Sequence, residues 1–287
     1  MEIVTAYKND DRLRGSFIAL TKRVFGLDLT GWYEAGFWQN DYIPYSVVID
    51  GNIVSNVSVN VCNIKWKNRV HHLAQLGTVE TDERFRGRGY SHALMEKVLG
   101  ECDASFDGTY LFAEEHMAPY YELFGFRRMS EYQCRKKVNI TSKRQVEKIP
   151  IETEEDRLRM VDIIQRRAQF GKFIMVNNPG LFMFYLTGAM SDSVYYVPSS
   201  EAYVIADVNG DTLTVYAVFS DEKVSLGEII SSFGSDIKRI VLAFTPENNT
   251  GFELIKIESE DSVLLVRGEV FSDIGNERFM FPLIAQA

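Results

Sequence analysis

The sequence predicts an α/β layer fold built from two successive units. Strand-like and helix-like hydrophobic patterns alternate along residues 2–138. The dipeptide Asp50-Gly51 separates two apolar runs, which is a strong hairpin signal. A similar series of predicted helices and strands recurs beyond residue 152, and a chain of 287 residues is long enough for two domains. We therefore expect a domain at residues 1–140, a polar, basic linker at 141–152 and a second domain at 153–287.

The elements of the first unit follow from hydrophobic periodicity. In chain order they are a strand at 2–7, helices at 10–25 and 30–37, strands at 45–49, 54–65 and 73–81, a helix from residue 90 to about 98, a strand at 109–113, a helix at 117–124, and one or two strands within 126–138. The helix at 10–25 places Leu13, Phe17 and Leu20 on one face, which indicates that it packs on the sheet.

The second unit repeats this order of elements. We expect helices at 154–170 and 179–189, strands at 194–197, 202–208 and 212–219, a helix at 226–233, a strand at 237–244, and terminal strands at 263–266 and 278–284. The recurrence suggests a second copy of the same fold.

Residues 84–89 read Arg-Phe-Arg-Gly-Arg-Gly and lie between a predicted strand and a predicted helix. Two glycines let the backbone approach a ligand closely, and the following helix directs its unpaired N–H groups and positive dipole end at the loop. The three arginines add charge suited to a polyphosphate. The segment therefore predicts a phosphate-binding loop; the alternative for so short a motif is an ordinary turn with solvated arginines.

A second motif follows one predicted helix and one predicted strand later, where residues 121–126 read Tyr-Glu-Leu-Phe-Gly-Phe. In this order the two motifs resemble those of the GNAT superfamily of N-acetyltransferases, in which Arg/Gln-x-x-Gly-x-Gly/Ala precedes Tyr-Glu-x-x-Gly-Phe. The resemblance implies an α+β fold with a mixed, mostly antiparallel central sheet flanked by helices. It also implies acetyl-CoA as co-substrate, no metal, and acetyl transfer to a primary amine by direct attack in a ternary complex.

The resemblance assigns the acetyl-CoA site residue by residue. The pantetheine arm would pair with the backbone near Val79 and Thr81, where that strand splays from the next one. Glu114 stands where the family more often has an Asn that contacts the cofactor, so it is a candidate cofactor contact and a second carboxylate. The pyrophosphate would lie on the loop and the helix start, formed by Arg84, Arg86, Gly87, Arg88, Gly89, Tyr90 and Ser91.

Acetyl transfer to an amine needs a base for the nucleophile and an acid for the departing thiolate. Tyr121 matches the family tyrosine that often protonates the thiolate, and a phenol has a suitable pKa for that step. A packing role is the alternative, with Tyr120 as the neighbouring candidate acid. Glu80 lies on the strand that enters the loop, where many family members carry the base. The alternative bases are His71, His72 and His116.

The second unit repeats the elements but not the chemistry. Residues 220–225 read Ser-Asp-Glu-Lys-Val-Ser, with no glycine pair and with two acids where a phosphate would lie. Repulsion between like charges disfavours coenzyme A there. We therefore interpret this unit as a degenerate GNAT-like domain.

Charge and composition restrict the partners. Residues 1–150 carry a net charge of +1 and the rest −10, so an acidic lobe would draw cationic substrates toward the cleft, unless the charge serves solubility alone. Nucleic acid is disfavoured as a partner. The expected acceptor is a small-molecule or peptide amine, whose pocket the aromatic residues within 32–42 would line unless they form a buried helix face. The sequence is compatible with an oligomer.

The cysteines and the chain start indicate the compartment. Cys62, Cys102 and Cys134 are widely spaced and form neither a disulfide framework nor a zinc-ligand pattern. No apolar run is long enough to span a bilayer, and residues 1–7 lack the features of a signal peptide. We therefore expect a cytoplasmic protein with no membrane partner.

Tandem GNAT domains of which only the first carries the motifs resemble the front two domains of Eis-like acetyltransferases, which acetylate amines of aminoglycosides or proteins. Those proteins have a third, sterol-carrier-like domain whose terminus enters the active site, and the sequence up to Ala287 has no counterpart, so that mechanism is not carried over. Two alternatives stay open. One is a Fem-type aminoacyltransferase, against which the intact loop at 84–89 weighs, and the other is a non-catalytic acyl-CoA sensor or interaction module.

Overall fold

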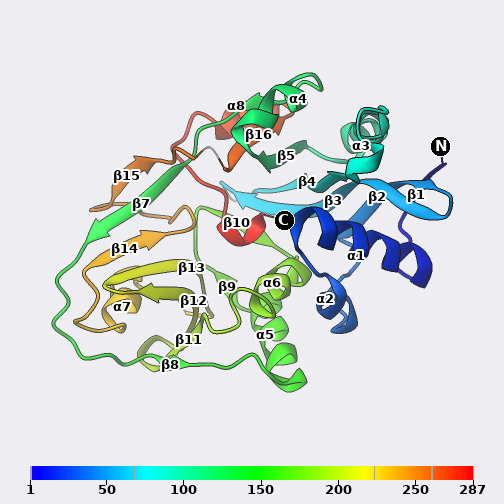
Figure 1. Cartoon of the computed structure of the whole chain (residues 1–287). Helices are drawn as coiled ribbons and strands as arrows, with labels where there is room; N and C mark the ends of the chain where they lie inside the picture. Colours follow the sequence, from blue (N-terminus) through cyan, green and yellow to red (C-terminus); the bar gives the residue numbers. More distant parts are fainter. Residues whose placement is uncertain (1, 68, 223, 260, 287) are drawn as a thin grey trace.

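The computed structural model describes residues 2–67, 69–222, 224–259 and 261–286. They form two mixed, mostly antiparallel sheets of eight strands each, which lie side by side with helices around and between them (Figure 1). Here the first lobe means the sheet that contains β1–β5 together with helices α1–α4, and the second lobe means the sheet that contains β11–β14 together with α5–α7. The α+β fold class expected from the motifs is confirmed.

The first lobe begins with elements close to those predicted. They are β1 (Glu2–Thr5), α1 (Asp11–Phe25), α2 (Thr30–Glu34), β2 (Tyr42–Ile49), β3 (Asn52–Trp66), β4 (Arg69–Thr81), α3 (Tyr90–Ser105), β5 (Gly108–Ala113), α4 (Ala118–Glu122) and β6 (Arg127–Arg128). The turn between β2 and β3 has positive φ at both Asp50 and Gly51, the two-residue hairpin that an Asp-Gly pair favours.

The remaining elements complete both sheets. They are β7 (Tyr132–Lys137), β8 (Glu147–Lys148), α5 (Glu154–Arg166), β9 (Ala168–Gln169), β10 (Phe173–Val176), α6 (Pro179–Leu186), β11 (Val194–Val197), β12 (Ala202–Asn209), β13 (Thr212–Ser220), α7 (Leu226–Ser231), β14 (Arg239–Leu242), β15 (Glu253–Lys256), β16 (Val263–Arg267) and α8 (Val270–Ile274). In each sheet one neighbouring pair is parallel, β4 with β5 and β13 with β14.

The two sheets exchange strands. β7 follows the first-lobe elements in sequence but lies between β15 and β14 in the second sheet, whereas β10 and β16 belong to the first sheet. β16 pairs with β5 and β6, and β10 pairs with the far end of β3. The expected division at residues 141–152 stays a prediction about chain organisation, and the strand pairing crosses it in both directions.

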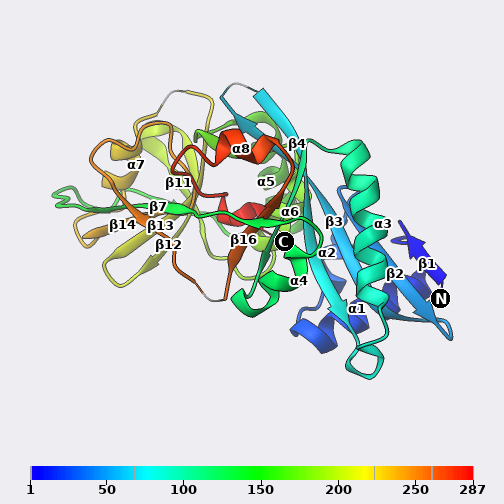
Figure 2. The ribbon, with the colours of Figure 1, turned by 90° about the horizontal axis from the view of Figure 1, so that it is seen from above.

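The predicted strand at 278–284 is wrong. Phe281 is fully buried and stacks on Tyr110 at 4.2 Å, and its backbone N–H donates to the Glu131 carboxylate at 2.7 Å instead of to a neighbouring strand. The carbonyl of Ala285 accepts a hydrogen bond from the Tyr110 hydroxyl at 2.9 Å. This apolar segment therefore fills the space between the lobes, as Figures 1 and 2 show, and hydrophobicity alone does not distinguish such a segment from a buried strand.

A shared apolar core joins the lobes. Phe17 of α1 and Trp38 belong to the same buried cluster as Phe182 of α6 and Phe219 of β13. A second cluster lies between the first sheet and the helices α3 and α4. At β4 the first sheet is therefore covered by α1 on one face and by α3 and α4 on the other, as Figure 2 shows.

The described part of the chain contains no helix long and apolar enough to cross a bilayer.

Candidate active site

The parallel pairing of β4 with β5 stops partway along both strands. It runs from Leu73 opposite Gly108 to Leu76 opposite Leu111, and no pairs join the described residues beyond. β4 nevertheless continues to Thr81 and β5 to Ala113. The strands thus open into a V, and the edge of β4 that faced β5 is free to pair with another extended chain.

A bulge marks the opening of this V. In the pairing with β3, Asn56 lies opposite Glu80 and Ser58 opposite Gly77, so Thr78 and Val79 together oppose Val57. Thr78 has φ +43°, a conformation that costs about 1–3 kcal/mol for a residue with a Cβ and persists only where the surroundings impose it.

Two side chains hold the bulge. The Tyr42 hydroxyl lies 2.6 Å from Thr78 Oγ1, and Asn56 Nδ2 donates to the Thr78 carbonyl at 2.9 Å. Both side chains are buried, so these hydrogen bonds fix the backbone that faces the V. Sequence reasoning did not predict these contacts: it placed Tyr42 among the aromatic residues of an acceptor pocket, and nothing in the sequence brings Tyr42 next to a position 36 residues away.

The loop predicted to bind phosphate joins β4 to α3. Gly87 has φ +74° and Gly89 φ +78°, and Gly89 is the residue that precedes the first turn of α3. A Cβ built at either glycine would meet no atom within 4 Å, so backbone conformation rather than space requires glycine here. The first-turn amides of α3, a helix of 16 residues that includes Tyr90 and Ser91, follow directly.

The arginines of the loop are tied to their neighbours in different ways. Arg84 makes two hydrogen bonds to the buried Asp82 carboxylate, at 3.0 and 2.9 Å, and Arg23 of α1 reaches the same carboxylate at 2.8 Å. The hydrogen bonds from Arg84 hold the pKa of Asp82 well below its usual range. Arg86 donates to the carbonyl of Thr81 at 3.3 Å, and Arg88 lies 4.9 Å from the Phe85 ring. Asp82 therefore fixes the loop to α1.

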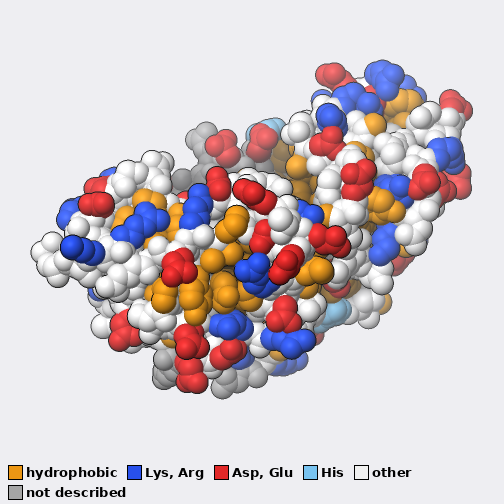
Figure 3. Space-filling view, turned by 90° about the horizontal axis from the view of Figure 1, so that it is seen from below, with side chains coloured by type: hydrophobic (Ala, Val, Ile, Leu, Met, Phe, Trp, Pro, Cys, Tyr) orange, Lys and Arg blue, Asp and Glu red, His pale blue; other side chains and the backbone are white. Residues whose placement is uncertain are grey.

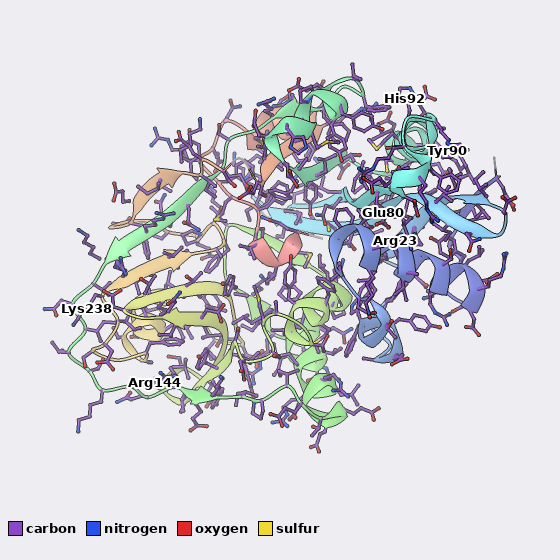
Figure 4. The ribbon with its side chains drawn as sticks, viewed as in Figure 1. Arg23, Glu80, Tyr90, His92, Arg144 and Lys238 are labelled. Carbon is purple, nitrogen blue, oxygen red and sulfur yellow. The ribbon has the colours of Figure 1, made fainter. Side chains whose placement is uncertain are left out.

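Glu80 is a buried carboxylate beside the V. It is 4% exposed, and its Oε1 accepts a hydrogen bond from Thr21 of α1 at 2.8 Å. Its Oε2 is buried and has no hydrogen-bond partner among the described residues. Burial raises the pKa of Glu80 to about 8, although the Thr21 hydrogen bond and the charge of Arg23 oppose the shift. Figure 4 shows Glu80 and Arg23 close together, where β4 meets α1.

Tyr121 and Tyr120 differ in what their hydroxyls contact. Tyr121 of α4 is 6% exposed and lies in the same apolar cluster as Val79 and Ala113, which flank the V. No hydrogen bond joins its hydroxyl to the described residues, and burial raises its pKa. The Tyr120 hydroxyl instead lies 2.7 Å from Ser91 Oγ at the start of α3. Of the two tyrosines, Tyr121 is therefore the one whose hydroxyl forms no hydrogen bond with the described residues.

The other candidate residues, Glu114, His71 and His72, lie on different parts of the first lobe from Glu80 and Tyr121. Glu114 is exposed and has His116 as its neighbour at 3.1 Å. His72 lies eight residues before Glu80 in β4, which separates the two by about 26 Å at about 3.3 Å per residue. His71 lies one residue further from Glu80 and packs near Trp66. Neither His71 nor His72 is close enough to share a reaction centre with Glu80.

The aromatic residues predicted for an acceptor pocket are mainly core. Phe37, Trp38 and Tyr42 are buried, and the indoles of Trp32 and Trp38 stack at 5.9 Å. Trp32 also lines a surface pocket of about 610 Å³ between α2 and α6. The other residues that line this pocket include Asp28, Glu34, Arg157, Phe184 and Tyr185. The second lobe thus contributes part of its wall.

The second lobe has the same V, but its own chain fills it. The parallel pairing of β13 with β14 stops at Val215 opposite Leu242, and β13 is irregular directly afterwards. Strand β9 then pairs with Phe219 and Ser220 of β13, and the N–H of Phe170 donates to the Val218 carbonyl at 2.9 Å. The edge that is free in β4 is therefore occupied in β13.

No group of three or more metal-ligating side chains occurs in the described ranges. The three cysteines are free and buried, and burial raises the pKa of the thiols of Cys62, Cys102 and Cys134. These thiols are poorly suited to act as nucleophiles.

Comparisons with known proteins agree with this geometry. Residues 10–129 match the family model for the acetyltransferase (GNAT) domain. No curated protein matches the chain.

Three solved structures share the fold over most of the chain. A conserved protein from Enterococcus faecalis V583, described as a probable N-acyltransferase, has a TM-score of 0.63 and 13% sequence identity, and the match covers 93% of this chain and 72% of that one. A GCN5-related N-acetyltransferase from Kribbella flavida has a TM-score of 0.56 and 13% identity, with coverage of 93% of this chain and 72% of that one. Eis1 from Mycobacterium abscessus has a TM-score of 0.57 and 12% identity, with coverage of 92% of this chain and 73% of that one. At such identities the likeness establishes the fold, and it confirms the tandem arrangement expected from the sequence.

One acetyl-CoA should bind per chain, with a calorimetric stoichiometry near one. Gly87→Glu should abolish binding, because a side chain is strained at φ +74° and a carboxylate repels the phosphates. Gly210→Glu is the matched control: Gly210 has φ +59° and open surroundings, in the hairpin between β12 and β13. Binding that persists in Gly87→Glu with a stoichiometry near one would show that this loop is not the site.

Proposed function

We propose that this chain, whose residues 10–129 match the family model for the acetyltransferase (GNAT) domain, is an acetyl-CoA-dependent N-acetyltransferase that transfers the acetyl group to a primary amine by direct attack in a ternary complex. The first lobe provides the open β4 edge for the pantetheine arm and the glycine loop for the pyrophosphate. The backbone of Val79 and the residues from Arg86 to Ser91 are the groups that would hold them.

The observation that carries this proposal is that Glu80 is a buried carboxyl group with a raised pKa and one oxygen without a partner among the described residues. A general base is most effective when its pKa is near the working pH, and burial raises the pKa of this carboxyl to about 8. One oxygen is held by Thr21, and the other has no partner among the described residues. A sensor that only binds acyl-CoA needs the loop but not such a carboxylate. The transferase is therefore the better-supported function.

The proposed roles of the side chains follow from balancing the protons. An ammonium group must lose a proton before its nitrogen can attack the thioester carbonyl carbon, and Glu80 accepts that proton. The carbon–sulfur bond then breaks, and the departing thiolate takes a proton from the Tyr121 hydroxyl. Tyr121 fits this role because it lies in the same apolar cluster as Val79 and Ala113, which flank the V, and its hydroxyl forms no hydrogen bond with the described residues. The attacking nitrogen gives up its second proton as the amide forms, this proton restores the tyrosine through water, and Glu80 releases its own proton to the solvent.

The pocket between α2 and α6 is the proposed acceptor site. Its carboxylates, Asp28 and Glu34, and the rings of Trp32, Phe184 and Tyr185 suit a cationic amine. Trp32 packs against Tyr42 with ring centroids 5.3 Å apart, and Tyr42 holds the bulge at Thr78. Lysines and arginines are interspersed with acids on the face that Figure 3 draws, so local carboxylates rather than a uniformly acidic surface would select the amine.

Tyr121→Phe should reduce turnover by about 10- to 1,000-fold and leave the affinity for acetyl-CoA nearly unchanged, because only the proton donor is lost. Steady-state assays over a panel of polyamines, aminoglycosides and lysine peptides, with calorimetry of acetyl-CoA, measure both quantities. Tyr120→Phe is the matched control and should lose only the contact with Ser91. If Tyr120→Phe reduces turnover more than Tyr121→Phe does, Tyr120 rather than Tyr121 is the proton donor.

The pH dependence of kcat/KM should show an ascending limb on the acidic side with an apparent pKa of about 8, because Glu80 must be deprotonated to accept a proton, and Glu80→Gln should remove this limb. Thr21→Val should move that limb to higher pH, because the Thr21 hydrogen bond lowers the pKa of Glu80. Thr21→Ser keeps a hydroxyl and is the control. A limb that is unchanged in Glu80→Gln would assign the base to another group.

Urea unfolding gives an independent readout of the same pKa. Between about pH 4.5 and 8, the folded chain holds a proton on Glu80 that the unfolded chain has released, so the free energy of unfolding falls as the pH rises through this window. Glu80→Gln should lack this part of the fall. An identical pH dependence in both proteins would show that Glu80 is not perturbed in this way.

A further inference from the structure

Two pockets of the second lobe adjoin each other. The first, called here the outer pocket, has a volume of about 830 Å³ and lies between β7, α7 and the chain that follows β14, and the second, called the inner chamber, has a volume of about 300 Å³. Both are lined by Ser225, Leu226 and Asn248, so they meet at these residues. Their volumes are in the usual range for small-molecule sites, about 300–1,000 Å³.

The inner chamber is mainly apolar. Val218, Ile229 and Phe244 line it and are almost completely buried, and Phe170 closes the side where β9 fills the V of the second lobe. Glu247, an exposed residue, is the carboxylate in this lining. Because the β13 edge is already paired, a pantetheine arm has no backbone to bind here, and the chamber suits a compact hydrocarbon group instead.

The outer pocket, in contrast, is lined by many polar and basic side chains. Lys136 and Lys137 line it together with hydroxyl and amide side chains, and no Asp or Glu is among its described lining residues. Neither lysine has an ion-pair partner in the part of the chain that the structure describes. Lys136 Nζ lies 5.4 Å from the centroid of the Phe252 ring, which also lines the pocket. Although residues 151–287 carry a net charge of −10, this local arrangement favours an anion.

We propose that the second lobe binds an amphipathic anion, a medium-chain carboxylate in chemical class, with its hydrocarbon group in the inner chamber and its carboxylate at Lys136. The site is separate from the acetyl-CoA site: Figure 4 shows Lys238, whose carbonyl accepts a hydrogen bond from Val138 of the pocket wall, on the opposite side of the molecule from Glu80 and Tyr90. The degenerate copy of the fold thus has a ligand of its own.

Calorimetry with octanoate on the full chain tests this site. One octanoate should bind per chain, whereas butanoate, which cannot fill the chamber, and octyltrimethylammonium, which has the wrong charge, should bind at least about 10-fold more weakly. Lys136→Gln should weaken octanoate binding by about 3- to 10-fold, as expected for losing one hydrogen bond of ordinary net strength at a solvent-exposed lysine. Lys143→Gln removes the same charge outside the pocket and should change nothing.

Leu226→Trp tests the position independently, because Leu226 lines both pockets and a larger side chain would fill the space where they meet. This variant should lose octanoate binding while its circular dichroism and thermal unfolding midpoint stay as in the unchanged protein. If Leu226→Trp folds and still binds octanoate with unchanged affinity, or if octanoate fails to bind the unchanged chain at millimolar concentration, the proposal is overturned.

Discussion

Beyond Leu76 the backbone of β4 has no parallel partner, and the arrangement of the site depends on how the strand is held there. An unpaired edge inside a sheet is unfavourable unless something else satisfies its polar groups. The bulge at Thr78, fixed by Tyr42 and Asn56, keeps the edge extended and separate from β5. The same bulge sets the direction of Glu80, two residues later, toward α1. The free edge and the buried carboxylate are therefore two consequences of one backbone irregularity.

The buried carboxylate also explains why α1 belongs to the site. Thr21 and Arg23, both on α1, contact Glu80 and Asp82 respectively, and Asp82 in turn holds Arg84 at the start of the glycine loop. Burial raises the pKa of Glu80, whereas the arginines lower that of Asp82. Near neutral pH Glu80 is therefore largely protonated and Asp82 is ionised, although only one residue separates them. The first is suited to proton transfer and the second to holding the loop.

The sequence predicted most of the elements and the place of the glycine loop, because periodicity, the Asp50-Gly51 turn and the paired glycines are local signals. It could not predict which sheet β7 and β16 join, since strand exchange depends on contacts over more than a hundred residues. It attributed the degeneracy of the second lobe to the missing glycine pair and to Asp221 and Glu222, and the structure adds another cause: β9 occupies the β13 edge. The contacts of Thr21 with Glu80 and of Tyr42 with Thr78 gave no signal, because the partners are distant in sequence.

The V between β4 and β5 is open, and the V between β13 and β14 is filled. Amide hydrogen exchange with and without acetyl-CoA tests this difference directly, because an amide that gains a hydrogen-bond partner exchanges more slowly. We expect slower exchange on binding at residues 77–91 and no change at residues 216–231. Slower exchange at 216–231 together with unchanged exchange at 77–91 would show that the cofactor binds the second lobe instead.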